Sequence, residues 1–303
     1  MIFNKLLFLV LIVSWARVAT GKITVLTTTS DLKSITEEVG GTEVEVESFC
    51  QGAQDPHFLE AKPSYMQKTN HADLVIAIGL GLEVGWLSKV LSGGRNPNVM
   101  DGKNGYLEVG PLVQVLEVPK GPVSRADGDV HPEGNPHVTL DPIRVGQIGE
   151  QIAIRLSTLD FSHAEKYKQN AALLKARLEN KTKSWQQRID QTTLKKIVTH
   201  HKTLSYFFDR FGIQNVAILE PFPGVPPTAP HVLSVINTSA KEGVKLLLVE
   251  NYFDDSVAKR VARDVPGVRV ESVPVSVGGT SEIKNVDDLF ENLVRKFESG
   301  KSK

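Results

Sequence analysis

The chain has little of several features that mark other classes of protein. Its 303 residues include one cysteine, Cys50, which excludes an internal disulfide and a cysteine-based zinc finger. The 35 basic and 35 acidic residues cancel, so the basic surface typical of a nucleic-acid-binding protein is not expected. The sequence contains no GxxxxGK[ST] motif, and we therefore expect no ATP site in the chain itself.

The chain has one long apolar run, and it lies at the N-terminus. Lys5 precedes the unbroken run 6–13 (LLFLVLIV), and Ala19-Thr20-Gly21 supplies small residues at a cleavage point. This pattern predicts a secretory signal peptide over residues 1–21. An N-terminal membrane anchor is disfavoured, because about 20 apolar residues are needed to span a bilayer. The cleavage point has no cysteine, so we expect a secreted, periplasmic chain that is not lipid-anchored.

Short β-type runs alternate with helical patterns on both sides of a long helical middle. Residues 22–29 (KITVLTTT) and 72–78 (ADLVIAI) resemble buried strands, with a helical pattern over 63–71 between them. The alternation returns after residue 190, with strand patterns at 196–199 and 244–250. Strands that alternate with helices predict parallel sheets in an α/β fold.

The middle of the chain predicts one long amphipathic helix over residues 162–190. Such a helix is about 40 Å long, more than a single lobe needs, and we interpret it as a rigid link between two α/β lobes. Two helices broken near Asn180 are the alternative. Ser162 and Glu165 match a capping box. The predicted domains are 1–21 (signal peptide), 22–161 (N-terminal lobe), 162–190 (linking helix) and 191–303 (C-terminal lobe). The apolar face comprises Tyr167, Ala171, Leu174, Leu178, Trp185 and Ile189.

Three of the eight histidines lie where predicted strands give way to loops or helices. His57 ends a Gln-Asp-Pro-His sequence, His137 ends Asn-Pro-His, and His201 follows the strand pattern at 197–199. Imidazole nitrogens are good ligands for zinc, so these residues are candidate metal ligands. Surface or capping roles are the alternative for dispersed histidines, and we favour that interpretation for His71, His163 and His231.

Four stretches resemble the signatures of the ZnuA/TroA-type solute-binding proteins, the zinc and manganese receptors of bacterial ABC importers. They occur in the right order, and the resemblance as a whole extends over nearly the whole mature chain. The resemblance implies two α/β lobes bridged by a rigid helix, a metal in the cleft between them, and no enzymatic activity. The stretches are 54–87 (QDPHFLEAKPSYMQKTNHADLVIAIGLGLEVGWL), 134–142 (GNPHVTLDP), 198–213 (VTHHKTLSYFFDRFGI) and 246–251 (LLLVEN).

The resemblance also implies which residues bind the metal. It places the first three ligands at His57, His137 and His201, and it gives the adjacent His200 a non-ligand position. A late carboxylate, the fourth ligand in many family members, falls near Ser276, where this chain has no acid.

The fourth ligand therefore stays open between a water molecule, Asp55 and Glu250. We prefer Glu250, which ends a predicted buried strand. An equal alternative is that Glu250 only orients a ligand histidine. Three imidazoles with few oxygens favour Zn²⁺, with Mn²⁺ as the second possibility.

An acidic loop precedes the second predicted ligand. Asp127, Asp129, His131 and Glu133 lie in the segment RADGDVHPEGNP, residues 125–136. This loop resembles a shortened form of the His/Asp-rich loop in zinc-type family members. It is either a weak collector of metal or an ordinary solvated loop.

We consider three functions. The preferred one is a monomeric periplasmic receptor that captures Zn²⁺ and delivers it to an ABC permease in the inner membrane. The alternative is an exported zinc-dependent hydrolase with a His₃ site, in which Glu250 or Asp55 acts as general base. Dinucleotide binding is the third, suggested by Gly79, Gly81 and Gly85, but their spacing departs from the GxGxxG motif by one residue. We interpret these glycines as turn formers.

Overall fold

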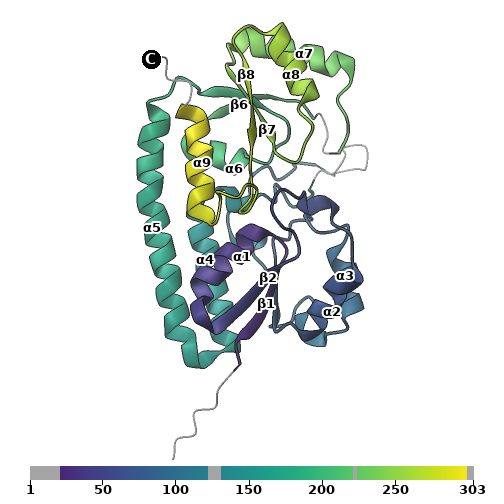
Figure 1. The fold of residues 1–303 in the computed structure, drawn as a ribbon, viewed down its shortest axis with the longest axis vertical. Coiled ribbons are helices and arrows are strands. Elements are labelled where there is room, and N and C mark those ends of the chain that lie inside the picture. Colours follow the sequence, from purple (N-terminus) through teal and green to yellow (C-terminus); the bar gives the residue numbers. More distant parts are fainter. Residues whose placement is uncertain (1–20, 122–130, 221–223, 299–303) are drawn as a thin grey trace, which may run out of the picture.

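The computed structural model describes residues 21–121, 131–220 and 224–298. The predicted signal peptide (its residues 1–20) lies outside the described residues, as do Asp127 and Asp129 of the acidic loop. The described chain forms two lobes stacked end to end beside one long helix (Figure 1). The predicted fold class, two parallel-sheet α/β lobes with a long helix between them, is confirmed.

The first lobe is built on a four-stranded parallel sheet with the order β2-β1-β3-β4. Its inner strands are buried along their length because helices cover both faces of the sheet, as parallel sheets require. The short strand β4 was not predicted from the sequence. The elements of this lobe are β1 (Ile23–Thr27), α1 (Ser30–Gly40), β2 (Val44–Ser48), α2 (Pro63–His71), β3 (Leu74–Ala77), α3 (Leu87–Gly94) and β4 (Tyr106–Glu108).

The second lobe repeats this plan with the strand order β6-β5-β7-β8, again all parallel. In both sheets the order reverses beside the first strand, and ligands of open α/β sheets bind at such a reversal, outside the carboxyl ends of the strands. The elements are β5 (Lys196–Thr199), α6 (Ser205–Phe211), β6 (Gln214–Ile218), α7 (Ala229–Glu242), β7 (Leu246–Glu250), α8 (Ser256–Asp264), β8 (Arg269–Val273) and α9 (Val286–Glu298).

Helices α4 (Pro142–Leu159) and α5 (Ala164–Asp190) connect the two lobes. Helix α5 has no break near Asn180 and runs along both lobes, beside α1 and α4 below and α9 above (Figure 1). Every residue of its predicted apolar face is buried. One apolar core therefore continues from the first lobe through α4 and α5 into the second, while each sheet has a separate cluster on its other face.

Helix α5 does not begin with the predicted capping box. Its first residue is Ala164, and the residue before it makes no side-chain cap. Asp160 takes that role one turn earlier, where its carboxylate accepts hydrogen bonds from the backbone and hydroxyl of Ser162 and from the hydroxyl of Tyr167. An aspartate can cap a turn as well as a serine can, and Glu165 pairs instead with Lys168.

Candidate metal centre

His57 is positioned by the turn that follows β2. Pro56 begins a single 3₁₀ turn over 56–58, and the carboxylate of Asp55 caps it by accepting a hydrogen bond from the His57 backbone. The same carboxylate oxygen lies 2.6 Å from His57 Nδ1. A carboxylate on Nδ1 fixes the tautomer and leaves the Nε2 lone pair free to bind a metal.

His201 is held in the same way in the second lobe. It follows β5, and its Nδ1 lies 2.5 Å from a carboxylate oxygen of Glu220, a buried residue just after β6. The other oxygen of Glu220 accepts a hydrogen bond from the backbone of Gly224. His201 Nε2 is again the atom left for a ligand.

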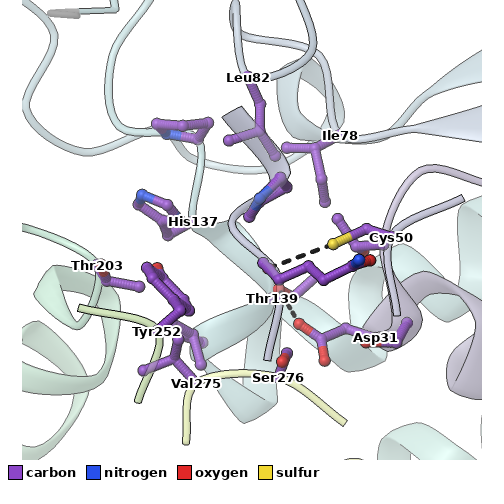
Figure 2. A pocket seen from close by; sticks show the side chains of 16 residues that line it. Asp31, Cys50, Ile78, Leu82, His137, Thr139, Thr203, Tyr252, Val275 and Ser276 are labelled. Atoms are coloured by element: carbon purple, nitrogen blue, oxygen red, sulfur yellow. Dashed lines mark hydrogen bonds between the residues drawn. The ribbon is translucent and has the colours of Figure 1, made fainter. Parts of the chain in front are cut away.

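His137 lies where the two lobes meet. Its backbone donates to the side chain of Asn135, which in turn donates to the carbonyl of Lys202 in the second lobe. The His137 ring is buried, and its Nε2 atom has no hydrogen-bond partner. Figure 2 shows this ring in a pocket between the lobes, where Thr203 and Tyr252 of the second lobe lie beside it.

These three histidines converge although they come from distant parts of the chain. Each offers one ring nitrogen, and the three atoms all lie within 4.8 Å of one another. The ring centroids are 5.4 Å apart for His57 and His137, 6.0 Å for His57 and His201, and 5.7 Å for His137 and His201. Three imidazole nitrogens at this spacing can bind one divalent cation.

Burial and neighbouring carboxylates shift the pKa values of two of these rings, His137 and His201. Burial, with the charges of neighbouring His57 and His201, holds the pKa of His137 well below its usual value, so this ring is neutral at pH 7. Burial would also lower the pKa of His201, but the hydrogen bond to Glu220 and the charges of Glu250 and Asp55 outweigh it and raise that pKa. Of these two rings, His201 is therefore the one at which a cation would compete with a proton.

The predicted candidates for a fourth ligand do not join this group. The Asp55 carboxylate is engaged by His57, and the Ser276 hydroxyl donates to the carbonyl of Gly52. Glu250 ends β7 and is fully buried, and its carboxylate oxygens have no well-formed hydrogen bond, although the Thr203 side chain lies close enough to lower its pKa. Burial raises the pKa of Glu250, and the neighbouring His201 opposes that rise.

His131 is a fourth histidine at the centre, which we placed only in the acidic loop. Its Nε2 lies 3.2 Å from Nε2 of His57, and the two rings stack with centroids 5.3 Å apart. The Pro-Glu-Gly turn that returns the chain from His131 to the Asn135-Pro136-His137 segment was the available signal in the sequence.

The remaining histidines have other partners. His200 stacks on Phe253 with ring centroids 4.4 Å apart. His163 is bound to the carboxylate of Asp160, and His231 to the carbonyl of Ile218. His71 is exposed at the end of α2.

The backbone N–H groups of the glycine turn after β3 already donate to a side chain of the protein. The buried carboxylate of Glu83 accepts hydrogen bonds from the backbone of Ile78 and Gly79 and from the hydroxyl of Thr28. Burial, despite these bonds, raises the pKa of Glu83 to about 7. A dinucleotide phosphate would need these same backbone donors, so the turn-forming interpretation of Gly79 and Gly81 agrees with the structure; both have positive φ.

Named relatives of this chain bind different metals. The manganese ABC transporter substrate-binding lipoprotein PsaA of Streptococcus pneumoniae is 27% identical over 80% of this chain and 76% of its own length. The zinc-binding lipoprotein AdcA of the same species (strain ATCC BAA-255 / R6) is 25% identical over 84% of this chain and 50% of its own length. Manganese and zinc are therefore both represented among similar proteins.

The expectation of a chain without a lipid anchor is wrong. It is contradicted by these relatives, which are lipoproteins by name. The expectation rested on a single local absence, that of a cysteine at the predicted cleavage point. Within residues 21–121, 131–220 and 224–298, no helix combines the length and apolarity needed to cross a bilayer.

The fold agrees with a solved structure of the same kind. The crystal structure of ZnuA superposes with a TM-score of 0.78 at 22% identity and covers 93% of this chain and all of its own. The family model of zinc-uptake complex component A, periplasmic, matches residues 25–299. Proteins of this family are substrate-binding components of metal ABC importers and not enzymes, so the alternative of an exported zinc hydrolase is wrong. The chain belongs to the ZnuA family.

Proposed function

We propose that this protein captures Zn²⁺ between its lobes and delivers it to an ABC permease in the inner membrane. In this proposal residues 1–21 direct export, residues 22–161 and 191–303 are the two lobes, and residues 162–190 link them. The protein acts as a monomer. The observation that carries the proposal is the convergence of His57, His137 and His201 within 4.8 Å.

The donor set supports zinc as the preferred metal. Zinc takes imidazole nitrogen readily and is satisfied by four ligands, whereas manganese prefers oxygen ligands. The three converging donors are all nitrogens, and the Asp55 and Glu220 carboxylates are bound to the far sides of two of the rings. In this arrangement these two acids raise the basicity of the ligands without supplying oxygen to the metal.

We place Glu250 outside the ligands, as in the second of its two predicted roles, but we assign it an electrostatic effect in place of orienting a histidine. Its carboxylate is outside the group of three ligand atoms and acts on the charge of His201. A buried carboxylate without hydrogen bonds is costly unless a positive charge lies nearby. Glu250 therefore supplies negative charge that offsets part of the charge of a bound dication.

Single alanine substitutions of His57, His137 and His201 test the proposal. Each should weaken zinc binding at least tenfold, because a ligand is lost from a small donor set. His71→Ala and His163→Ala are matched controls, since these rings lie outside the group. Isothermal titration of the five variants measures the effect, and equal affinities across the set would overturn the assignment.

The choice of metal has a separate test. Protein purified from cells without added metal should contain zinc by elemental analysis. Competitive titration should also give a lower Kd for Zn²⁺ than for Mn²⁺. A manganese-filled protein, or a lower Kd for Mn²⁺, would contradict the zinc proposal while leaving metal capture intact.

A further inference from the structure

The proposed centre has three protein ligands, and a tetrahedral zinc site needs a fourth. The carboxylates of Asp55 and Glu220 are engaged, because Asp55 holds His57 and Glu220 holds His201. Glu250 and His131 both lie outside the group of three atoms within 4.8 Å of one another. Ser276 donates its hydroxyl to a backbone carbonyl. We therefore looked to a different side chain for the fourth coordination position, one with a donor atom close to the ligand nitrogens.

His131 has a nitrogen beside one of these three atoms, that of His57. Its Nε2 faces Nε2 of His57 at 3.2 Å. Two nitrogens bound to one tetrahedral zinc, each 2.0–2.1 Å from the metal, are about 3.3 Å apart. The separation of these two atoms thus matches one edge of a zinc coordination tetrahedron.

The glycine turn after β3 makes room for this ring. A side chain at Gly81 would place its Cβ 3.2 Å from Nδ1 of His131. Gly81 also has a φ of +81°, which disfavours any other residue. Besides ending β3, the turn therefore leaves the space in which the His131 ring packs against its backbone.

We propose that His131 is the fourth ligand and that the site binds zinc through four imidazoles. On binding, the His131 side chain shifts toward His137 and His201, so that its Nε2 joins theirs and that of His57 around one ion. A site of four nitrogens selects zinc against manganese more strongly than three nitrogens with a carboxylate. This inference rests on the proposed function, since it concerns the same ion.

X-ray absorption of the zinc-loaded protein tests the inference directly. The wild-type spectrum should fit four imidazoles with no carboxylate, and His131→Ala should lose one imidazole. His71→Ala, which removes an exposed histidine, is the matched control and should keep all four. A wild-type site of three imidazoles and one oxygen, or an unchanged count in His131→Ala, would overturn the inference.

Titrations separate this inference from the proposed function. His131→Ala should raise the Kd for Zn²⁺ at least tenfold and the Kd for Mn²⁺ less, so the ratio of the two affinities should fall. If His57→Ala abolishes zinc binding while His131→Ala and wild type are equal, His131 is not a ligand and the proposed function stands. If Glu250→Gln removes a ligand from the absorption spectrum, Glu250 holds the fourth position and the inference is wrong. Should wild type bind no zinc, both fail.

Thermal unfolding shows whether a variant loses zinc affinity because it is misfolded. His131 is partly exposed, so His131→Ala should melt within a few degrees of wild type when both are metal-free. His131→Gln, which keeps a polar side chain of similar reach, should give the same loss of zinc affinity as His131→Ala. Recovery of wild-type affinity in His131→Gln would assign the residue a packing role instead and contradict ligation.

Discussion

At the scale of single residues, two carboxylates hold the rings of two proposed ligands in place. The Nδ1 atoms of His57 and His201 face Asp55 and Glu220, one acid from each lobe. Each acid is itself fixed by a backbone N–H, that of His57 for Asp55 and that of Gly224 for Glu220. The ligand rings therefore have their orientation before a metal arrives.

Glu220 should matter for metal affinity although its carboxylate is directed away from the ion. Glu220→Ala should weaken zinc binding about 10- to 100-fold, because the His201 ring loses its anchor. Glu220→Gln should lose less, since its amide oxygen can still accept from Nδ1. Competition with a zinc chelator measures both. Glu242→Gln, which removes an exposed partner of Lys196, should bind as wild type; if Glu220→Ala does so too, the orienting role is wrong.

Asp31 predicts a pH-dependent stability. Its carboxylate accepts hydrogen bonds from the backbone of Val277 and the hydroxyl of Thr139, the second of which is drawn in Figure 2. Burial outweighs these bonds and raises the Asp31 pKa from 3.8 to about 6. Since the folded pKa is the higher one, ionisation opposes folding: the penalty is full above pH 6 and disappears as the pH falls toward 3.8.

Asp31→Asn should remove this pH-dependent penalty. Relative to wild type, the variant should be stabilised more at pH 7.5 than at pH 4, with a free energy of unfolding larger by about 2–3 kcal/mol for a shift of this size. Urea unfolding of both proteins at the two pH values measures the change. A difference between the proteins that is the same at both pH values would contradict it.

At the scale of elements, α5 is the part of the fold on which both lobes depend. Helix α4 packs closely against it, because Gly146 and Gly149 have no side chains to keep the two helices apart. Leu174 of α5 fills the space beside Gly149 and is fully buried. The next residue, Leu173, is 68% exposed.

These two neighbouring leucines form a matched pair for a stability test. Leu174→Ala should cost about 2–5 kcal/mol, since it leaves a cavity between α4 and α5. Leu173→Ala should change stability by less than about 0.5 kcal/mol, because that side chain faces solvent. Chemical denaturation compares them, and similar losses for both would argue against the packing described for α5.

Sequence patterns predicted the elements with strong periodicity better than the details between them. The apolar face of α5 was predictable residue by residue, and α2 was predictable from a proline in its first turn. The capping box at Ser162 was wrong because Asp160 competes for the same turn. The Pro-Glu-Gly turn after His131 indicates only that this residue lies near His137. Its place at the centre also depends on the space that Gly81 leaves, which the sequence does not reveal.

At the scale of the whole molecule, the lobes are joined by more than the linking helix. The backbone of Val277 bonds to Asp31, the carboxylate of Asp141 pairs with Arg210, and Asn135 bonds to Lys202. Together with the apolar core that runs through α4 and α5, these contacts oppose a large opening of one lobe from the other.

Zinc binding should therefore leave the overall shape unchanged. Small-angle X-ray scattering profiles of the metal-free and zinc-loaded protein should superimpose. The melting temperature should rise with zinc in the same samples, because a ligand that binds only the folded state stabilises it. A smaller radius of gyration after loading would mean that the lobes close on the metal.

The converging nitrogens come from segments that span residues 57 to 201, and the acid behind the last of them stands at residue 220. A chain that ends before residue 201 lacks one of these nitrogens. At the proposed site, metal can therefore be bound only after the chain has been made beyond residue 220 and both lobes have assembled. Metal loading would then indicate that the two lobes have folded.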